Sequence, residues 1–396
     1  MSRLIRSVSG VERIWLAAEG LTPPFCNQMV IEGEGVLPLA EAAHGWQRAL
    51  HEVSCNYPGA RMRLAGRLSS LVWEEGDQPP LLRVVDGGGW DGRSGANAPF
   101  LRALLSPKTG PVAEVVLVHG AVPRVVIRTH HAAFDGQGTL LLAEDFFKAL
   151  RGEPVRETCG GPQTDYDLAC ASGRVAETSP EADCESWQEP AGCAETILWA
   201  RETMHDVPNM PLAGLLHVLA QTRRKSRFDI PVDMRRHMPG LRSTANLTGL
   251  IRLEVTPEEG PAAIHSRLHE SIARREEADF VLGAQRVVGV PLWLMRRAGR
   301  YAARKCYENH RFVCSATVSN LGNLDARRYS GDGFSGSRVF FIPPGGLALP
   351  LFIALTGGEW GLEICAAAPG RLTDQAGLTS LLAEVAEKLG RMEIKD

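Results

Sequence analysis

Two adjacent histidines, an aspartate and a glycine stand close together around residue 130. They are His130, His131, Asp135 and Gly136, in the pattern H-H-x-x-x-D-G. The imidazole of histidine has an ordinary pKa near neutrality, so it can accept a proton from an alcohol or an amine while a new bond forms. This segment is therefore the first candidate for a catalytic site.

The residues before the histidines predict a β-strand from Arg124 to His130, because β-branched side chains dominate this run. Successive side chains of a strand point to opposite faces. His131 should therefore share a face with Ile127, and His130 should share the other face with Val126. The two histidines are expected to have different roles. The end of a strand is also a rigid place from which to present an imidazole to a ligand.

The residues after the histidines predict a turn followed by a helix. Asp135 and Gly136 suit the turn, because Asp bonds to nearby backbone and Gly tolerates positive φ. Apolar residues then recur at near-helical spacing over residues 137–150. The sequence thus predicts a strand–turn–helix unit with His131 at its first junction. A core histidine and a capping aspartate would give the same local pattern, and from these residues alone that alternative stays open.

The pattern resembles the HHxxxDG motif of the condensation-domain and CoA-dependent acyltransferase superfamily, which includes chloramphenicol acetyltransferase-like enzymes. The resemblance implies an α/β fold of two chloramphenicol acetyltransferase-like lobes in a V, with a substrate tunnel between them. It implies that His131 is the catalytic base near the middle of the tunnel, and that His130 is a motif residue. Asp135 would be structural and paired with a distant arginine, and Gly136 would leave room for the substrate arm or the turn.

Two further segments fit the same resemblance. Residues 231–236, P-V-D-M-R-R, resemble the arginine-bearing stretch of the superfamily, and residues 246–249 resemble the strand entry that follows it. Arg235 is the expected partner of Asp135, with Arg236 as the second choice.

Residues 318–322 resemble the S-N-x-G stretch found near the tunnel in acyltransferases of this type. The resemblance makes Ser319, Asn320 and Gly322 candidates for binding the substrate or the oxyanion that forms during acyl transfer. Taken alone, the same residues suit an ordinary turn after a strand at 312–317.

The resemblance implies transfer of an acyl group from a CoA or carrier-protein thioester to an alcohol or amine, forming an ester or an amide in natural product biosynthesis. The acyl-CoA or phosphopantetheine thioester would be a co-substrate, and no tightly bound cofactor and no metal are expected. The expected partners are a small-molecule acceptor and an acyl or peptidyl carrier protein. The D-F-G-W-G run of the plant branch is absent. Two alternatives are a docking or gating protein without turnover, and a hydrolase, dehydratase or cyclase on the same fold.

Composition narrows the class of protein. The 396 residues are enough for two domains of ordinary size. With 44% hydrophobic and 22% charged residues and a net charge of −3, nothing points to nucleic acid. No apolar run approaches the roughly 18 residues of a membrane helix, so no membrane span is expected. The nine scattered cysteines suit reduced thiols in a cytoplasm.

The chain is expected to have three parts. These are an N-terminal lobe at 1–160 that carries the motif, a crossover linker at 161–193 rich in Gly, Pro, Ser and acidic residues, and a C-terminal lobe at 194–396. Further strands are expected at 28–32, 68–73, 81–85, 114–118, 250–255, 338–342, 351–355 and 360–366. Further helices are expected at 39–53, 195–204, 212–221, 261–277, 292–307 and 374–392.

Other patterns carry little chemistry. His265 and His269 are four residues apart on an expected helix, but no third metal ligand is evident. Four cysteines in or next to the linker, Cys159, Cys170, Cys184 and Cys193, are spaced too irregularly for a structural zinc site. A G-x-S-x-G elbow is also absent, which argues against an α/β-hydrolase.

Overall fold

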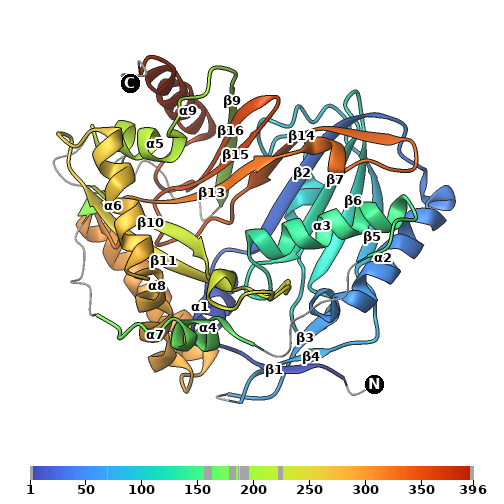
Figure 1. The fold of residues 1–396 in the computed structure, drawn as a ribbon, viewed down its shortest axis with the longest axis horizontal. Coiled ribbons are helices and arrows are strands. Elements are labelled where there is room, and N and C mark those ends of the chain that lie inside the picture. The colour runs from blue at the N-terminus through green and yellow to red at the C-terminus, as the bar shows by residue number, and fades with distance from the viewer. Residues whose placement is uncertain are drawn as a thin grey trace.

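The computed structural model describes residues 3–68, 70–155, 163–177, 184–185, 187, 196–221 and 226–392. Two mixed sheets lie side by side, each with helices packed against it (Figure 1). The expected lobe boundaries, near residues 160 and 194, lie outside the described residues.

The first sheet has five strands in the order β14-β2-β7-β6-β5. Its strands are β2 (Cys26–Gly35), β5 (Leu81–Asp86), β6 (Ala113–His119), β7 (Arg124–His130) and β14 (Phe334–Ile342). Strand β14 comes from late in the chain and pairs antiparallel with β2, so residues beyond 194 complete the sheet of the first lobe. All residues of β7 are buried, as expected for a sheet covered on both faces.

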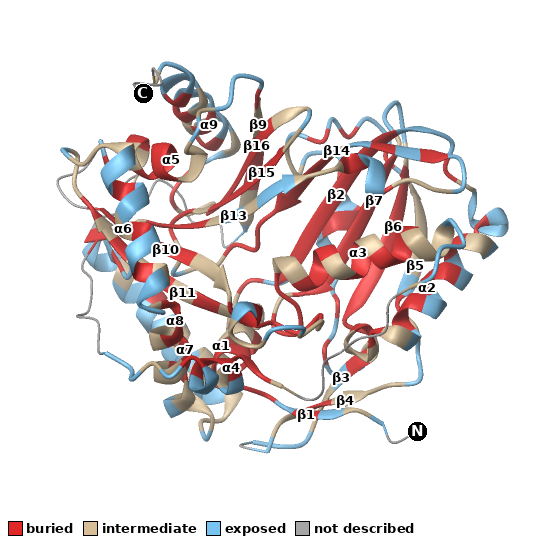
Figure 2. Cartoon of the chain, in the orientation of Figure 1, coloured by how far each residue is buried: buried red, intermediate tan, exposed pale blue. Residues whose placement is uncertain are grey.

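Helices α2 (His44–Asn56) and α3 (Gly136–Leu150) pack against one face of this sheet (Figure 1). Val125 and Ile127 of β7 join their core, while Val126 joins a separate core on the opposite face. This alternation confirms the strand pattern expected before the histidines. Figure 2 shows how the buried residues concentrate in the strands and on the inner faces of these helices.

The second sheet has six strands in the order β11-β10-β13-β15-β16-β9. They are β9 (Ile197–Met204), β10 (Ser226–Asp233), β11 (Thr248–Val255), β13 (Ala316–Leu324), β15 (Phe352–Gly358) and β16 (Gly361–Pro369). Its outer face packs against α5 (Pro211–Ala220), α6 (Pro261–Ala273) and α9 (Gln375–Gly390). Phe228, Ile230 and Ile251 point into that core, so the alternate residues of these strands face the other way.

The two lobes share a buried contact. Trp199 of β9 and Cys365 of β16 pack with Val126 and other residues of the first sheet. Arg201 of β9 adds an ion pair with Glu32 of β2 at 3.1 Å. Burial and ionic pairing together join the lobes.

A third group of helices packs together next to β11, at the lower left of Figure 1. It contains α1 (Gly10–Glu19), α4 (Asp165–Ala171), α7 (Glu277–Ala284) and α8 (Leu292–Asn309). Small sheets pair β1 (Ile5–Ser7), β4 (Val72–Glu75) and β3 (Met62–Ala65), and also β12 (Arg311–Phe312) with β8 (Cys184–Glu185). In the described chain no single helix is both long and apolar enough to cross a membrane, and only α7 and α8 meet that test jointly, across a 119° bend.

Most predicted elements are present, but the strand expected at 68–73 overlaps β4 only at Val72 and Trp73, and one helix is wrong. The expected helix at 195–204 is the strand β9, which pairs antiparallel with β16 along its whole length. Its local sequence mixes helix and strand formers, and tertiary pairing decides between them. The expected helix at 39–53 begins only at His44, after a short 3₁₀ turn at Ala40–Ala42. Helix α1 was not predicted.

Candidate active site

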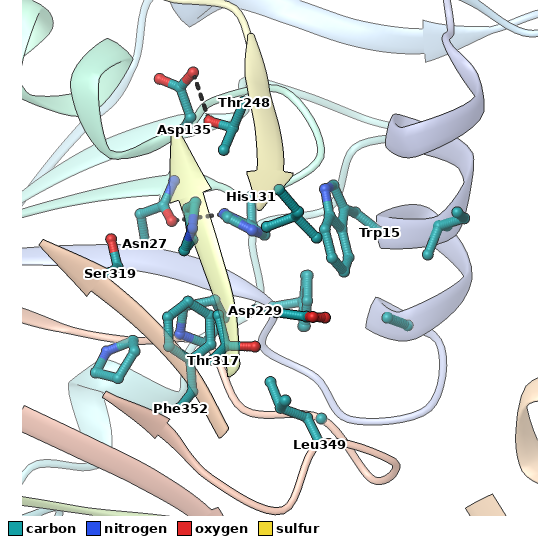
Figure 3. A pocket seen from close by; sticks show the side chains of 18 of the residues that line it. Trp15, Asn27, His131, Asp135, Asp229, Thr248, Thr317, Ser319, Leu349 and Phe352 are labelled. Carbon is teal, nitrogen blue, oxygen red and sulfur yellow. Dashed lines mark hydrogen bonds between the residues drawn. The ribbon is translucent and has the colours of Figure 1, made fainter. Parts of the chain in front are cut away.

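A cavity of about 550 Å³ lies between the two lobes. Its walls come from α1, α8, strands β10 and β13, and the segment 343–349, and they are mostly apolar. Figure 3 shows His131, Asn27 and Asp229 among the side chains around this space. The volume is in the range of sites for small organic ligands.

His131 follows directly after β7, and both of its backbone groups are bound. Its N–H donates to the carbonyl of Phe25 at 3.0 Å, and its carbonyl accepts from Asn246 Nδ2 at 2.7 Å. Phe25 belongs to the first lobe, and Asn246 lies two residues before the start of β11 in the second sheet. The backbone of His131 is therefore fixed from both sides, while its ring lines the cavity.

Asn27 of β2 determines which nitrogen of His131 carries the proton. Its Nδ2 donates to the carbonyl of Phe134 at 2.9 Å and to Thr129 Oγ1 at 3.3 Å. Its Oδ1 lies 2.7 Å from His131 Nδ1 and can only accept. In the neutral ring, Nδ1 therefore carries the hydrogen and Nε2 keeps a free lone pair, an assignment that follows from this network.

Aromatic rings enclose the imidazole of His131. The ring centroids of Trp15 and Phe25 each lie 5.3 Å from that of His131. Burial lowers the pKa of His131 to about 4, although the negative charge of Asp135 opposes this shift. His131 is therefore neutral around pH 7, in the form that can accept a proton.

His130 points away from the cavity. Its side chain is buried, and its Nδ1 accepts from the backbone N–H of Ala132 at 3.2 Å. The ring of Trp73 packs edge-on against the imidazole, with 6.5 Å between the ring centroids, and Glu19 Oε1 lies 3.7 Å from His130 Nε2. His130 therefore packs in the protein interior and does not line the cavity.

The expected pairing of Asp135 with Arg235 is present. Arg235 Nη1 donates to Asp135 Oδ2 at 2.9 Å and Nη2 donates to Oδ1 at 3.0 Å, and both side chains are buried. The N–H of Leu247 adds a bond to Oδ2 at 2.7 Å. The second choice, Arg236, contacts Glu277 instead. Asp135 does not contact the imidazole through any hydrogen bond that the described residues make, so it ties the motif to the second lobe.

The expectation that Gly136 uses positive φ is wrong. Gly136 is the first residue of α3, Asp135 caps that helix by accepting from Gly138 N at 2.6 Å, and Gly136 is absent from the described glycines with positive φ. What Gly136 supplies is space, since a Cβ there would lie 2.7 Å from Leu321 Cδ2. At Gly138 a Cβ would lie 2.2 Å from the carbonyl oxygen of Thr244.

The S-N-x-G segment lies within a strand and is not a turn. Ser319, Asn320 and Gly322 belong to β13, and the pairing of β13 with β15 shifts register between Asn320 and Asn323. Ser319 and Asn320 line the cavity. Gly322 has φ +77° and lies outside the described lining, and its N–H donates to Asn320 Oδ1 at 3.0 Å.

Several cavity residues were not predicted from the sequence. Asn27 and Trp15 contact His131 itself, and Asp229 and Thr317 reach the cavity from the second sheet. A polar Asn between Cys26 and the apolar run of β2 was the available indication for Asn27. Nothing local indicates which face of α1 presents Trp15.

Metal ligands do not gather in the part of the chain that the structure describes, where no group of three or more His, Cys, Asp or Glu side chains could hold an ion. His265 and His269 pack edge-to-face on α6, with ring centroids 4.4 Å apart. Of the four cysteines in or next to the linker, Cys159 and Cys193 lie outside the described residues.

Solved structures of similar fold cover nearly the whole chain. The starter condensation domain of rhizomide synthetase RzmA, in a variant complexed with C8-CoA, matches with a TM-score of 0.66 and 16% identity over 98% of this chain and 94% of that one. The first condensation domain of the CDA synthetase gives 0.63 and 16%, covering 98% and 95%. The condensation domain of the monacolin K polyketide synthase MokA gives 0.62 and 12%, covering 98% of both.

No protein-family model matches the sequence, and no curated protein is similar to it by sequence. The chain nevertheless has the fold of condensation domains, with two lobes of the chloramphenicol acetyltransferase type. The fold class expected from the sequence is confirmed.

Proposed function

We propose that this chain is an acyltransferase in which His131 is the general base. The observation that carries the proposal is the free Nε2 of His131, which lines a cavity between the lobes while Asn27 holds the proton on Nδ1. A neutral imidazole in this state can remove a proton from an alcohol or an amine.

The acyl donor is a thioester, on CoA or on a carrier phosphopantetheine. Support comes from the fold and from the RzmA domain, whose structure holds C8-CoA. The apolar walls of the cavity here suit an acyl chain. The acceptor is a small molecule with a hydroxyl or amino group.

The reaction needs no covalent enzyme intermediate. As His131 Nε2 takes the proton, the acceptor oxygen or nitrogen bonds to the thioester carbon, giving a tetrahedral oxyanion. The carbon–sulfur bond then breaks, and the leaving thiolate takes the proton from the imidazolium. Binding both substrates in one cavity supplies much of the rate by proximity.

The oxyanion needs hydrogen-bond donors placed in advance. Ser319 and Asn320 are the candidates, since both line the cavity. The Ser319 hydroxyl makes no hydrogen bond to another described residue, and Asn320 Nδ2 is also available while its Oδ1 accepts from Gly322. His130, Asp135, Gly136 and Arg235 act by holding the motif.

The test is release of free thiol from a panel of acyl-CoA and acyl-carrier thioesters, with and without mixed alcohol and amine acceptors, with products identified by mass. Acceptor-dependent release and an acylated acceptor are expected. Equal release without acceptor would indicate hydrolysis. Binding of a thioester or carrier without any release would indicate a docking or gating protein. Either result would contradict the proposal.

A further inference from the structure

A row of four side chains, three of them polar, crosses the mostly apolar wall of the cavity. In the second sheet Asp229 of β10 is paired with Arg252 of β11 on one side and with Thr317 of β13 on the other, and Thr317 is paired with Phe352 of β15. All four residues line the cavity. The row follows from strand alternation, because the residues before and after each member along its own strand face the outer core.

Asp229 is the unusual member of this row. Its side chain is buried, with 8% of the residue exposed, and its Oδ1 has no hydrogen-bond partner. Burial raises the pKa of Asp229, and the charges of Arg252 and Arg227 oppose that shift. A buried carboxylate oxygen without a hydrogen bond is costly, so its position in the cavity points to a ligand.

Arg252 has an unpaired hydrogen-bond donor next to this acceptor. Its Nε is also buried without a hydrogen-bond partner, and it lies 3.7 Å from Asp229 Oδ1. This separation is longer than a direct hydrogen bond. Its guanidinium group also lies 5.6 Å from the ring centroid of Phe280, another lining residue. Two residues that line the cavity thus each hold a buried polar atom without a hydrogen-bond partner, one an acceptor and one a donor.

The chemistry of the pair selects the ligand group. A cation would satisfy Asp229 but leave Arg252 Nε unpaired and be repelled by it, and an anion would be repelled by Asp229. An alkyl group would leave both unpaired. A hydroxyl donates and accepts through a single oxygen, which suits two atoms only 3.7 Å apart, whereas an amide donates and accepts through separate atoms.

We infer that Asp229 and Arg252 form a specificity site for a hydroxyl group on one of the two substrates, at the wall of the cavity that His131 serves. This inference rests on the proposed function for the reaction, but its test rests on binding alone. Figure 3 shows Asp229 and His131 as side chains of the same cavity. The hydroxyl can belong to the acyl donor or to the acceptor, and two arms of the experiment separate these sources.

The experiment measures dissociation constants of the full chain by calorimetry. The donor arm compares octanoyl-CoA with its hydroxylated isomers, one for each chain position. The acceptor arm compares octylamine with the corresponding amino alcohols. In one arm, one isomer should bind at least about tenfold more tightly than the compound without hydroxyl, as expected for a hydrogen bond to a charged group.

Asp229→Leu should bring this ratio to within about threefold, mostly by weakening the hydroxylated ligand. Asp229→Asn, which keeps the size and one acceptor oxygen, should retain part of the preference. Phe352→Leu is the matched control in the same row and should affect both ligands alike. Thermal melting checks that each variant is folded.

Equal binding of every isomer in both arms would overturn the inference, and so would a preference that survives in folded Asp229→Leu. Loss of catalysed transfer with every donor, alongside an intact and Asp229-dependent preference, would overturn the proposed function while supporting the hydroxyl site.

Discussion

Asn27 Oδ1 lies 2.7 Å from His131 Nδ1, and this contact leaves the other imidazole nitrogen free to act as a base. In this chain the orienting group is a neutral amide from the neighbouring strand, while the motif carboxylate of Asp135 is bound to Arg235. A neutral partner fixes the tautomer without adding a charge beside the ring. That arrangement is consistent with the low pKa of His131.

Replacing Asn27 should impair catalysis through His131. Asn27→Leu removes the acceptor for Nδ1–H, so we expect kcat/KM to fall about 10- to 100-fold, by analogy with the loss of a group that orients a metal-bound histidine. The loss should be mainly in kcat. Steady-state kinetics with the best donor and acceptor measures it.

Asn27→Asp is the informative contrast. It keeps an acceptor at the same place and adds a negative charge, so activity should recover in part and the pKa of His131 should rise. Unchanged kinetics in both variants, with normal melting, would show that Asn27 does not orient the base.

In the pH profile of kcat/KM, the loss of activity on the acid side should occur at a lower pH than for an ordinary catalytic histidine. Burial lowers the pKa of His131 to about 4, so the ring stays deprotonated at pH values where an ordinary histidine would be protonated. Activity limited by this group should therefore persist down to about pH 5 and be lost as the pH falls through about 4. A profile with its acid midpoint at 6.5 would contradict the geometry given for His131.

Asp135→Ala should destabilise the fold as well as reduce activity. It leaves the guanidinium of Arg235 buried without its main partner, which should lower the free energy of unfolding by about 3 to 5 kcal/mol. Urea unfolding followed by circular dichroism measures the change.

Glu359→Ala is the matched control for Asp135→Ala, because it breaks the exposed ion pair with Arg327 and should leave the free energy of unfolding nearly unchanged. A soluble Asp135→Ala protein that melts normally but is inactive would instead indicate a direct chemical role for Asp135.

Asp165 should make the protein less stable as the pH rises. Burial and the negative charge of Glu12 raise the pKa of Asp165 to about 7. Between about pH 4 and 7 the folded state therefore binds a proton that the unfolded state has released, and the stabilisation from that proton is lost as the pH rises through 7. Asp165→Asn should remove this slope and raise the unfolding free energy at pH 8, by up to roughly 4 kcal/mol.

Asp325→Asn provides the control, because Arg327 holds the pKa of the exposed Asp325 below its usual range and its titration falls outside this window. Parallel stability profiles for wild type and Asp165→Asn between pH 4 and 8 would count against the buried, proton-binding Asp165.

The motif and its geometry were accessible from sequence because they depend on short-range rules. Strand alternation placed His130 and His131 on opposite sides, and the resemblance supplied Arg235 as the partner of Asp135, a contact that the structure contains. The strand β9 was mistaken for a helix because its identity depends on pairing with β16, more than 150 residues away in the chain. Local sequence does not contain that pairing.

The residues of the cavity wall could not be predicted from the sequence, for a similar reason. Asp229 and Arg252 are ordinary alternating residues in their own strands, and only the register of β10 with β11 brings them together. Trp15 reaches His131 from α1, and the pleat of β2 presents Asn27 to the same ring. Such contacts between distant segments are set by tertiary packing.

The most direct test of the account compares thiol release by wild type, His131→Ala and His265→Ala, with an accepted acyl thioester and with or without its acceptor. His265 is an exposed histidine of α6 and serves as the matched control. We predict acceptor-dependent release by wild type and His265→Ala, and a loss of at least about 100-fold in His131→Ala. Release by folded His131→Ala at the wild-type rate, in the presence of acceptor, would contradict the assignment of His131 as the base.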